Sequence, residues 1–133
     1  DSVDLYQQGV LRLYMGPITG GGAVYAAGDH DYQITGSAAD EKFGWAQYNI
    51  GDIDANGSDD LIGISYSTGF SMLFYGPITA DIEASAYDAR FSSGYFDSYN
   101  GPFGAGAYPQ GDVNADGYDD FLTGAYLYFG EAL

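Results

Sequence analysis

Two nonapeptides carry the residues of this chain that are best suited to bind a metal ion. Residues 52–60 read DIDANGSDD and residues 112–120 read DVNADGYDD. In each loop, oxygen-bearing side chains stand at positions 1, 3, 5 and 9, and a glycine follows position 5. Alternate residues of a tight turn direct their side chains to one point, and the glycine permits the bend that returns position 9 to that point. The spacing therefore predicts two cation sites.

The ligands expected at these sites are all oxygen atoms. Positions 1, 3, 5 and 9 would bind through their side chains and position 7 through its backbone carbonyl. The ten residues are Asp52, Asp54, Asn56, Ser58 and Asp60 in the first loop, and Asp112, Asn114, Asp116, Tyr118 and Asp120 in the second. Hard oxygen ligands in six- or sevenfold coordination favour Ca²⁺ over Zn²⁺, copper or Mg²⁺.

A simpler interpretation of the same residues is a turn whose Asp and Asn side chains cap their own backbone. Two copies with one ligand spacing favour the metal site over this alternative. At position 8 we expect Asp59 and Asp119 to point outward, away from the ion.

The two loops belong to a repeat with a period of 60 residues. LYMGPITG (13–20) aligns with LFYGPITA (73–80), and FGWAQYNIGDIDANGSDDLIGISY (43–66) aligns with FGAGAYPQGDVNADGYDDFLTGAY (103–126). Such a period, with several strands per repeat, is typical of propeller blades or stacked β modules, in which one unit cannot bury both of its faces alone. We interpret residues 1–133 as a single repeat domain: a partial first unit (1–42), a complete second unit (43–102) and a partial third unit (103–133).

Each unit is expected to contain four antiparallel strands. FGAGAYPQGDV leads into the acidic loop, DFLTGAY follows it, FSMLFYG forms a third strand, and DARFSS or DYQITGS forms a weaker fourth. The loop then lies at the tip of a hairpin. SVDLYQ (2–7) aligns with the strand after a loop and LYFGEAL (127–133) with a third strand, so both terminal units are open and are expected to be completed by association between chains.

Composition supports an all-β fold and limits the partners. The 14 Tyr, 8 Phe and 21 Gly favour short strands and turns. Nineteen acidic residues against three basic ones give a formal net charge of -16, which disfavours nucleic acid and anionic membranes and attracts cations. There are no cysteines to form disulfides, and no apolar stretch approaches the roughly 20 residues of a membrane span. No signal-peptide pattern stands at Asp1, so an exported protein is expected here in its mature form.

The segments FGAGAYPQGDVNADGYDDFLTGAY and LFYGPIT resemble FG-GAP repeats, the blades of integrin α-subunit β-propellers and of many secreted bacterial proteins. In that family a DxNxDGxxD loop holds Ca²⁺ between two strands of a blade, which implies two calcium sites and an extracellular location here. Phe103, Gly104, Gly124 and Ala125 match the motif, whereas Ile64 stands where the family has alanine. Propellers close with about four to eight blades. Two loops are too few, which predicts a fragment of a longer protein, a ring of several chains or an open stack.

Aromatic residues offer a second type of site. Tyr95, Phe96 and Tyr99 in SGYFDSYNGPFG could stack on a sugar ring, or pack between sheets or against another chain. Trp45, beside Phe43 and Gly44, is expected to pack in the core between blades.

No catalytic machinery is predicted. His30 is the only histidine; it could join Asp29 and Asp31 in a third metal site, but a solvated turn residue is the simpler interpretation, and no GxSxG motif accompanies it. The carboxylates outside the loops show no spacing suited to glycoside hydrolysis: Asp81, Glu83, Asp88 and Asp97.

The sequence therefore predicts a secreted, calcium-binding structural or adhesive repeat protein that is not an enzyme. We expect it to self-assemble through its terminal strands into an oligomer or filament. The alternative is a lectin-like module that binds carbohydrate or a cell-surface protein.

Overall fold

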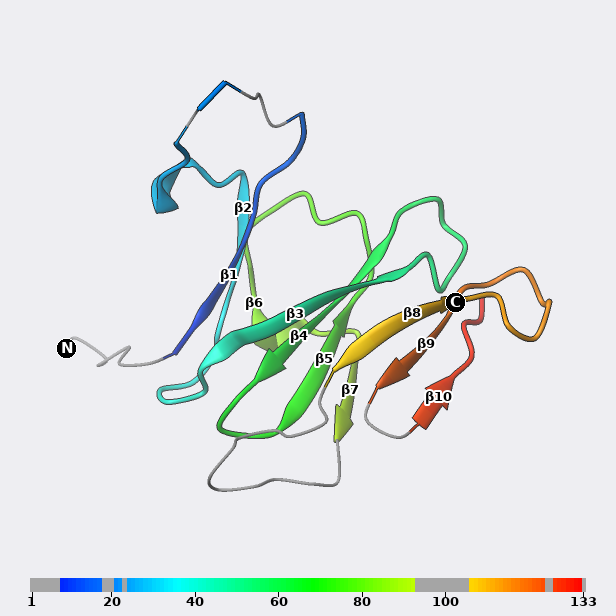
Figure 1. Cartoon of the computed structure of the whole chain (residues 1–133). Coiled ribbons are helices and arrows are strands. Elements are labelled where there is room, and N and C mark those ends of the chain that lie inside the picture. The colour runs from blue at the N-terminus through cyan, green and yellow to red at the C-terminus, as the bar shows by residue number, and fades with distance from the viewer. Residues whose placement is uncertain (1–7, 18–20, 23, 93–105, 124–125, 133) are drawn as a thin grey trace.

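The computed structural model describes residues 8–17, 21–22, 24–92, 106–123 and 126–132. The described chain is all-β, with three sheets and two short 3₁₀ helices (Figure 1). Its elements are β1 (Val10–Leu13), η1 (Ala27–Asp29), β2 (Tyr32–Thr35), β3 (Phe43–Gly51), β4 (Asp60–Ser65), β5 (Phe70–Phe74), β6 (Ile82–Glu83), η2 (Ala84–Ala86), β7 (Ala89–Ser92), β8 (Ala107–Gly111), β9 (Asp120–Thr123) and β10 (Tyr126–Tyr128). None of the described helices is long and apolar enough to cross a membrane.

The central sheet is formed entirely by the second unit. Its strands follow the order β3-β4-β5-β7, and every neighbouring pair is antiparallel. This confirms the four strands predicted for the complete unit, with loop 52–60 at the turn between β3 and β4. Successive residues of each strand point to opposite faces of this sheet, so its apolar side chains are divided between the two faces.

Two three-stranded sheets flank the central one (Figure 1). The third unit contributes β8, β9 and β10, which pair antiparallel with loop 112–120 between β8 and β9. The first unit contributes the antiparallel pair β1 and β2. The short strand β6 of the second unit adds to β2 in parallel. This parallel addition was not predicted, because a two-residue strand has no detectable periodicity.

The third unit has a shorter connection between its second and third strands. Leu61 pairs with Phe74 in the central sheet, and its counterpart Phe121 pairs with Tyr128. The third strand of the third unit therefore comes six residues earlier than the 60-residue period places it. In consequence LYFG (127–130) corresponds to LFYG (73–76), which confirms the predicted alignment of the C-terminal segment with a third strand.

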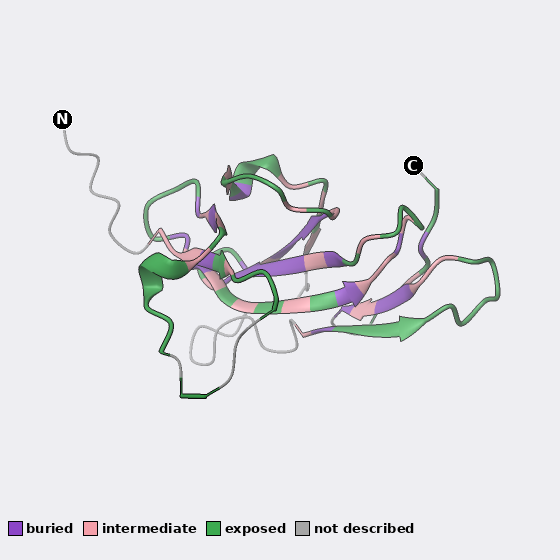
Figure 2. Cartoon of the chain, turned by 90° about the horizontal axis from the view of Figure 1, so that it is seen from above, coloured by how far each residue is buried: buried purple, intermediate pink, exposed green. Residues whose placement is uncertain are grey.

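The apolar core has two parts, one on each face of the central sheet. The cluster toward the third unit contains Ile50, Ile53, Ile62, Ile64, Leu73, Ala107 and Phe121. The cluster toward the first unit contains Leu11, Ile34, Phe43, Met72, Phe74 and Ala84. Burial runs through the middle of the molecule, whereas β8 is largely exposed (Figure 2). The central unit thus buries both faces only because neighbouring units cover them.

The prediction that Trp45 packs in the core is wrong. Its side chain is 64% exposed and lies beside Tyr66, with ring centroids 4.7 Å apart. The register of β3 shifts between Phe43 and Ala46, and Gly44 has a φ of 78°. Trp45 and Gln47 stand two residues apart in β3 and therefore share one face of the strand, and both are exposed.

Candidate metal centre

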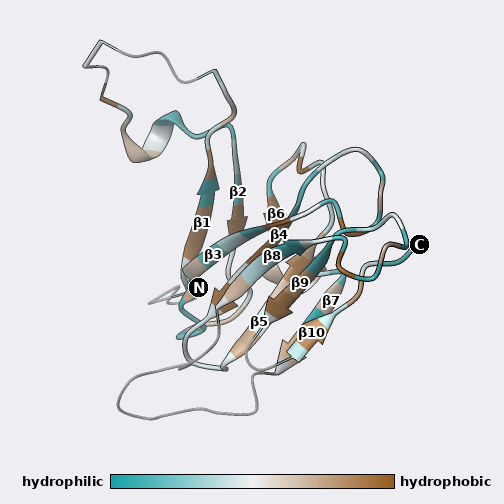
Figure 3. Ribbon diagram, turned by 45° about the vertical axis from the view of Figure 1, so that its right-hand side comes forward, coloured by the Kyte–Doolittle hydropathy of each residue, from teal (hydrophilic) through white to brown (hydrophobic). Residues whose placement is uncertain are grey.

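Both acidic loops connect adjacent antiparallel strands at the same end of the molecule (Figure 3), where hydrophilic residues gather. In each loop the backbone is left-handed at positions 4 and 6. The φ angles are 56° at Ala55 and 93° at Gly57, and 62° at Ala115 and 95° at Gly117. The glycine was expected from the sequence. The left-handed alanine was not, since alanine carries no signal for this conformation.

The carboxylate at position 1 organises the turn in both loops. Asp52 accepts hydrogen bonds from the backbone N–H groups of Asn56 (2.9 Å) and Gly57 (2.8 Å). The second loop repeats both bonds, from Asp116 (3.0 Å) and Gly117 (2.8 Å) to Asp112. Position 1 is thereby fixed at the centre of the loop, where a metal ligand is needed.

Positions 3 and 5 form a side-chain pair in both loops, with the chemical roles exchanged. In the first loop the Asn56 amide donates to Asp54 (2.9 Å). In the second loop the Asn114 amide donates to Asp116 (2.8 Å). Each loop therefore has one carboxylate and one amide at this pair, and each has three carboxylates among its four candidate side-chain ligands.

Position 7 has no side-chain role in either copy. The Ser58 N–H donates to Asn56 Oδ1 (2.8 Å), and the Tyr118 N–H donates to Asp116 Oδ1 (3.0 Å). The shared backbone bond agrees with the absence of a common residue at this position. The role of the position 7 carbonyl as a ligand stays a prediction.

The carboxylate at position 9 is buried, and it joins the loop to the end of the third strand. Asp60 is 1% exposed and accepts N–H bonds from Ile53 and Gly76, both at 2.8 Å. Asp120 is fully buried and accepts the equivalent bonds from Val113 (2.8 Å) and Gly130 (3.0 Å). Each carboxylate oxygen keeps a further lone pair for a cation.

The pKa of Asp60 reflects its burial and the neighbouring carboxylates. Burial raises the pKa of Asp60 above its ordinary value, and the nearby carboxylates of Asp54 and Asp52 add to the rise. The backbone N–H groups of Gly76 and Ile53 act in the opposite direction. A bound cation would stabilise the ionised form that burial and repulsion disfavour.

Three carboxylates of the first loop converge. Asp52, Asp54 and Asp60 each place one oxygen within 4.8 Å of the others. Among the described residues this is the one group of three acids that gathers so closely. In loop 112–120 the third carboxylate stands at position 5 instead of position 3. An oxygen-only set without a basic partner fits a hard cation such as Ca²⁺. The residues present therefore suit the metal that the spacing predicts.

Position 8 differs between the loops, and the prediction for Asp119 is wrong. Asp59 is exposed and accepts a bond from the Asn49 amide (2.7 Å). Asp119 instead contacts the first loop: its carboxylate accepts the Asp52 N–H (3.2 Å), and its own N–H donates to the Asp52 carbonyl (3.3 Å). A methyl group at Gly51 would overlap Asp119. The sequence gives no local signal for this contact, since it depends on how the third unit packs on the second.

His30 is not placed in a third metal site. Its Nδ1 lies 2.7 Å from the carbonyl of Ala27. The carboxylate of Asp29 accepts the Ala26 N–H (2.6 Å), and that of Asp31 accepts the Met15 N–H (2.7 Å). The two acids thus hold the backbone of this segment.

Two of the remaining candidate acids also bind backbone. Asp81 accepts the N–H of Gln33 (3.0 Å) and Asp88 that of Tyr75 (2.8 Å). Glu83 is exposed in β6. Four further candidates lie outside the described residues: Tyr95, Phe96, Asp97 and Tyr99.

An exposed aromatic group is the site that the sequence did not reveal. Trp45 lies beside Tyr66, and the Lys42 ammonium is 5.3 Å from the centroid of the Tyr66 ring. Lys42 and Trp45 also line an open depression of about 500 Å³ with Val10 and Gly44. Gly44, which has a φ of 78°, lies in this depression, and the alternation of apolar residues does not predict the site.

In comparisons with known proteins, the chain matches no family model and no curated protein. Its function is therefore argued from the loops and from the packing of the three sheets. The oxygen atoms of each loop suit a hard cation. The carboxylate at position 9 also bonds to the backbone after the third strand, so it connects the loop with that strand.

Proposed function

We propose that this chain is a secreted, calcium-binding structural repeat protein of the FG-GAP type, built from propeller-type blades, that assembles with copies of itself outside the cell. The observation that carries the calcium proposal is the duplicated loop. Two segments 60 residues apart fold into the same hydrogen-bond pattern around oxygen ligands at positions 1, 3, 5 and 9. In the first of them three carboxylates converge.

Calcium would add a cross-link to each hairpin. The ion would connect the turn with the buried carboxylate at position 9, which already accepts a hydrogen bond from the residue after the third strand. It would also reduce the electrostatic repulsion among the three carboxylates. Calcium at a hundred times its dissociation constant would stabilise the fold by about 2.7 kcal/mol per site. Extracellular modules of this kind bind in the millimolar range, which suits a secreted protein.

Self-assembly is supported by the apolar surface of the third unit. Five large side chains there are between 43% and 59% exposed: Tyr108, Val113, Tyr126, Leu127 and Phe129. Their counterparts in the second unit include Ile53 and Leu73, which are 5% and 2% exposed because the third unit covers them. Adjacent exposed apolar side chains favour contact with another molecule. Within the described part of the chain, the strands β1 and β10 also lie at the edges of their sheets.

Size-exclusion chromatography with light scattering, and electron microscopy of the same sample, test the assembly. We expect large ordered particles in millimolar Ca²⁺ that dissolve in a chelator. A compact monomer under both conditions would contradict self-assembly.

Calorimetric titration tests the metal separately. We expect two Ca²⁺ ions per chain, one after Asp54→Ala or Asp112→Ala, and a much weaker response to Mg²⁺. Unchanged calcium binding in both variants would contradict the assignment of the loops.

A carbohydrate-binding role is the second candidate, and the exposed Trp45 beside the half-buried Tyr66 favours it. Aromatic faces beside an open depression can stack on sugar rings. A glycan array with the monomeric protein tests this role, with Trp45→Ala as the matched variant. Binding that Trp45→Ala abolishes would favour a lectin-like module, whereas equal binding by both proteins would exclude this surface.

A further inference from the structure

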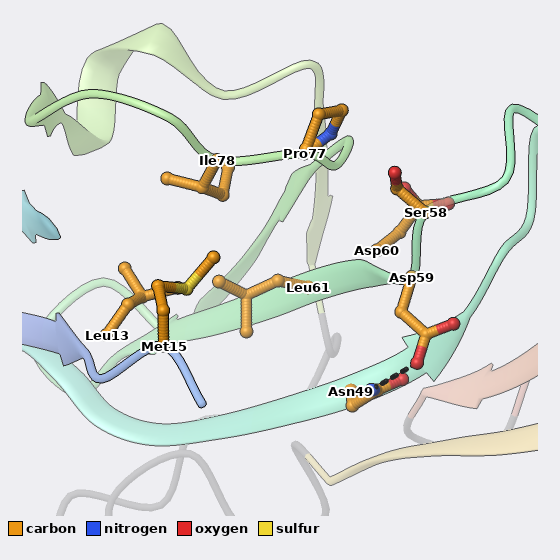
Figure 4. A pocket seen from close by; sticks show the side chains of 9 residues that line it. All are labelled: Leu13, Met15, Asn49, Ser58, Asp59, Asp60, Leu61, Pro77 and Ile78. Atoms are coloured by element: carbon orange, nitrogen blue, oxygen red, sulfur yellow. Dashed lines mark hydrogen bonds between the residues drawn. The ribbon is translucent and has the colours of Figure 1, made fainter. Parts of the chain in front are cut away.

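An apolar cavity lies between the first unit and the central sheet. Its volume is about 440 Å³. Leu13 and Met15 line it from the segment of β1, and Leu61 and Ile78 line it from the second unit (Figure 4). Asp59 lies at its rim, where its carboxylate bonds to Asn49 (Figure 4).

In the equivalent place between the second and third units Ile53 packs into the core, and a smaller cavity of about 210 Å³ remains beside it. Leu73 and Tyr75 correspond to Leu13 and Met15, and Phe121 corresponds to Leu61. All three lie around Ile53, which is the second residue of the first acidic loop and is 5% exposed. The internal repeat thus identifies the kind of group that fits the cavity: the apolar residue at position 2 of an acidic loop.

Backbone contacts hold the first loop in that place. Asp119 accepts the Asp52 N–H and donates its own N–H to the Asp52 carbonyl, and the Glu131 N–H donates to Ile53 (3.0 Å). At the cavity of the first unit, Asp59 takes the position of Asp119. The carboxylate of Asp59 is exposed.

Loop 112–120 has the complementary features and no covering unit among the described residues. Val113 corresponds to Ile53 but is 53% exposed. Gly111 corresponds to Gly51, and both have a left-handed backbone, with φ of 66° and 83°. A methyl group at Gly51 would meet Asp119, whereas one at Gly111 would meet nothing within 4 Å. The second loop is therefore shaped like the first at the contact but lacks its partner.

The edge strands β1 and β10 are also equivalent. Residues 13–16 read LYMG and residues 127–130 read LYFG, and both segments correspond to LFYG at 73–76. Among the strands that the structure describes, each lies at the edge of its sheet. β10 pairs with β9 through three residues, two of which are exposed.

We propose that copies of the chain join head to tail, with loop 112–120 of one copy docked in the cavity of the next. Val113 fills the space between Leu13, Met15 and Leu61, and Asp59 bonds to the backbone of Asp112. This inference rests on the proposed self-assembly and names its contact. The loop and the cavity are different surfaces. Each dimer therefore keeps one free loop and one free cavity, and further copies can add to form open chains or closed rings.

Two substitutions block the two surfaces separately. Val113→Glu places a charge on the loop, and Met15→Glu places one in the cavity. Val24→Glu is the matched control, because Val24 is 91% exposed and lies in neither surface. Calcium titration checks whether the Val113→Glu loop still binds its ion. Gly111→Ala is expected to block the same contact with the loop sequence intact.

The measurement is the concentration at which half of the chains are assembled in millimolar Ca²⁺, from light scattering. We expect it to rise more than about tenfold in each blocked variant and to stay unchanged in Val24→Glu. An equimolar mixture of Val113→Glu and Met15→Glu should form particles of twice the monomer mass, since each keeps one working surface.

Assembly of Val113→Glu or Met15→Glu at the wild-type concentration would overturn the docking and leave the proposed function intact. A mixture that stays monomeric would also overturn it, because a head-to-tail contact must allow the pair. A wild-type chain that never assembles in calcium, because a segment of the chain itself fills the cavity or because no association occurs, would overturn both the docking and the proposed function.

Discussion

Loops 52–60 and 112–120 have the same internal hydrogen bonds and different surroundings. Position 1 accepts two backbone bonds and position 9 accepts two more in each copy. Yet Ile53 is 5% exposed and Val113 is 53% exposed. The difference teaches that the nonapeptide determines its own shape, whereas the neighbouring unit determines whether the loop is buried.

The largest expected effect is the loss of a position 9 carboxylate. Asp60→Ala leaves two N–H donors, those of Ile53 and Gly76, without a partner, at a cost of about 1–3 kcal/mol each, and in calcium it also removes a proposed ligand. We expect Asp60→Ala to lower the free energy of unfolding more than Asp120→Ala, because the first loop also supports the third unit. Urea denaturation in calcium and in chelator measures both. Equal losses would show that the packing of loop 52–60 adds nothing to its internal bonds.

Substitutions of Ile53 and Val113, the residues at position 2 of the two loops, test how much the neighbouring unit contributes to stability. Ile53→Ala removes a buried side chain from the core and should cost about 2–5 kcal/mol. Val113→Ala acts on an exposed side chain and should change the stability of the monomer by less than about 0.5 kcal/mol. Thermal unfolding of both variants at low protein concentration checks the pair. A large loss in Val113→Ala would mean that this loop is buried in the isolated chain.

The glycines before the loops give the smallest expected difference. Alanine is strained at both Gly51 and Gly111, which costs about 1 kcal/mol, and only at Gly51 does it also meet Asp119. We expect Gly51→Ala to be the less stable variant by about 1 kcal/mol or more. Chemical denaturation of the monomers gives the difference. Identical stabilities would show that Asp119 moves away from Gly51 without cost.

The sequence predicted the all-β fold, the four strands of the second unit and the position of both loops at hairpins. These features depend on local alternation and on a repeat that is visible without a structure. The missed features depend on contacts between units or on single backbone angles. Asp119 bonds to Asp52 across 67 positions of sequence, and the bulge beside Trp45 includes the left-handed backbone of Gly44.

The candidate site was likewise predicted in part: its residues were identified from the sequence, but its burial and its contacts were not. The residues of positions 1, 3, 5 and 9 follow from spacing, and Asp52, Asp54 and Asp60 do converge. The burial of position 9 and its bond to the residue after the third strand do not follow from spacing. They require the third strand to end beside the loop, which is a property of the assembled sheet.

The exchange of Asp and Asn between positions 3 and 5 has a consequence for how such loops can change over generations. Loop 52–60 pairs Asp54 with Asn56, and loop 112–120 pairs Asn114 with Asp116. Converting one order into the other takes two substitutions. The single intermediates contain either two acids, which repel each other, or two amides, which give up a charged ligand. We therefore expect each order to persist through descent, so that the order records ancestry as well as chemistry.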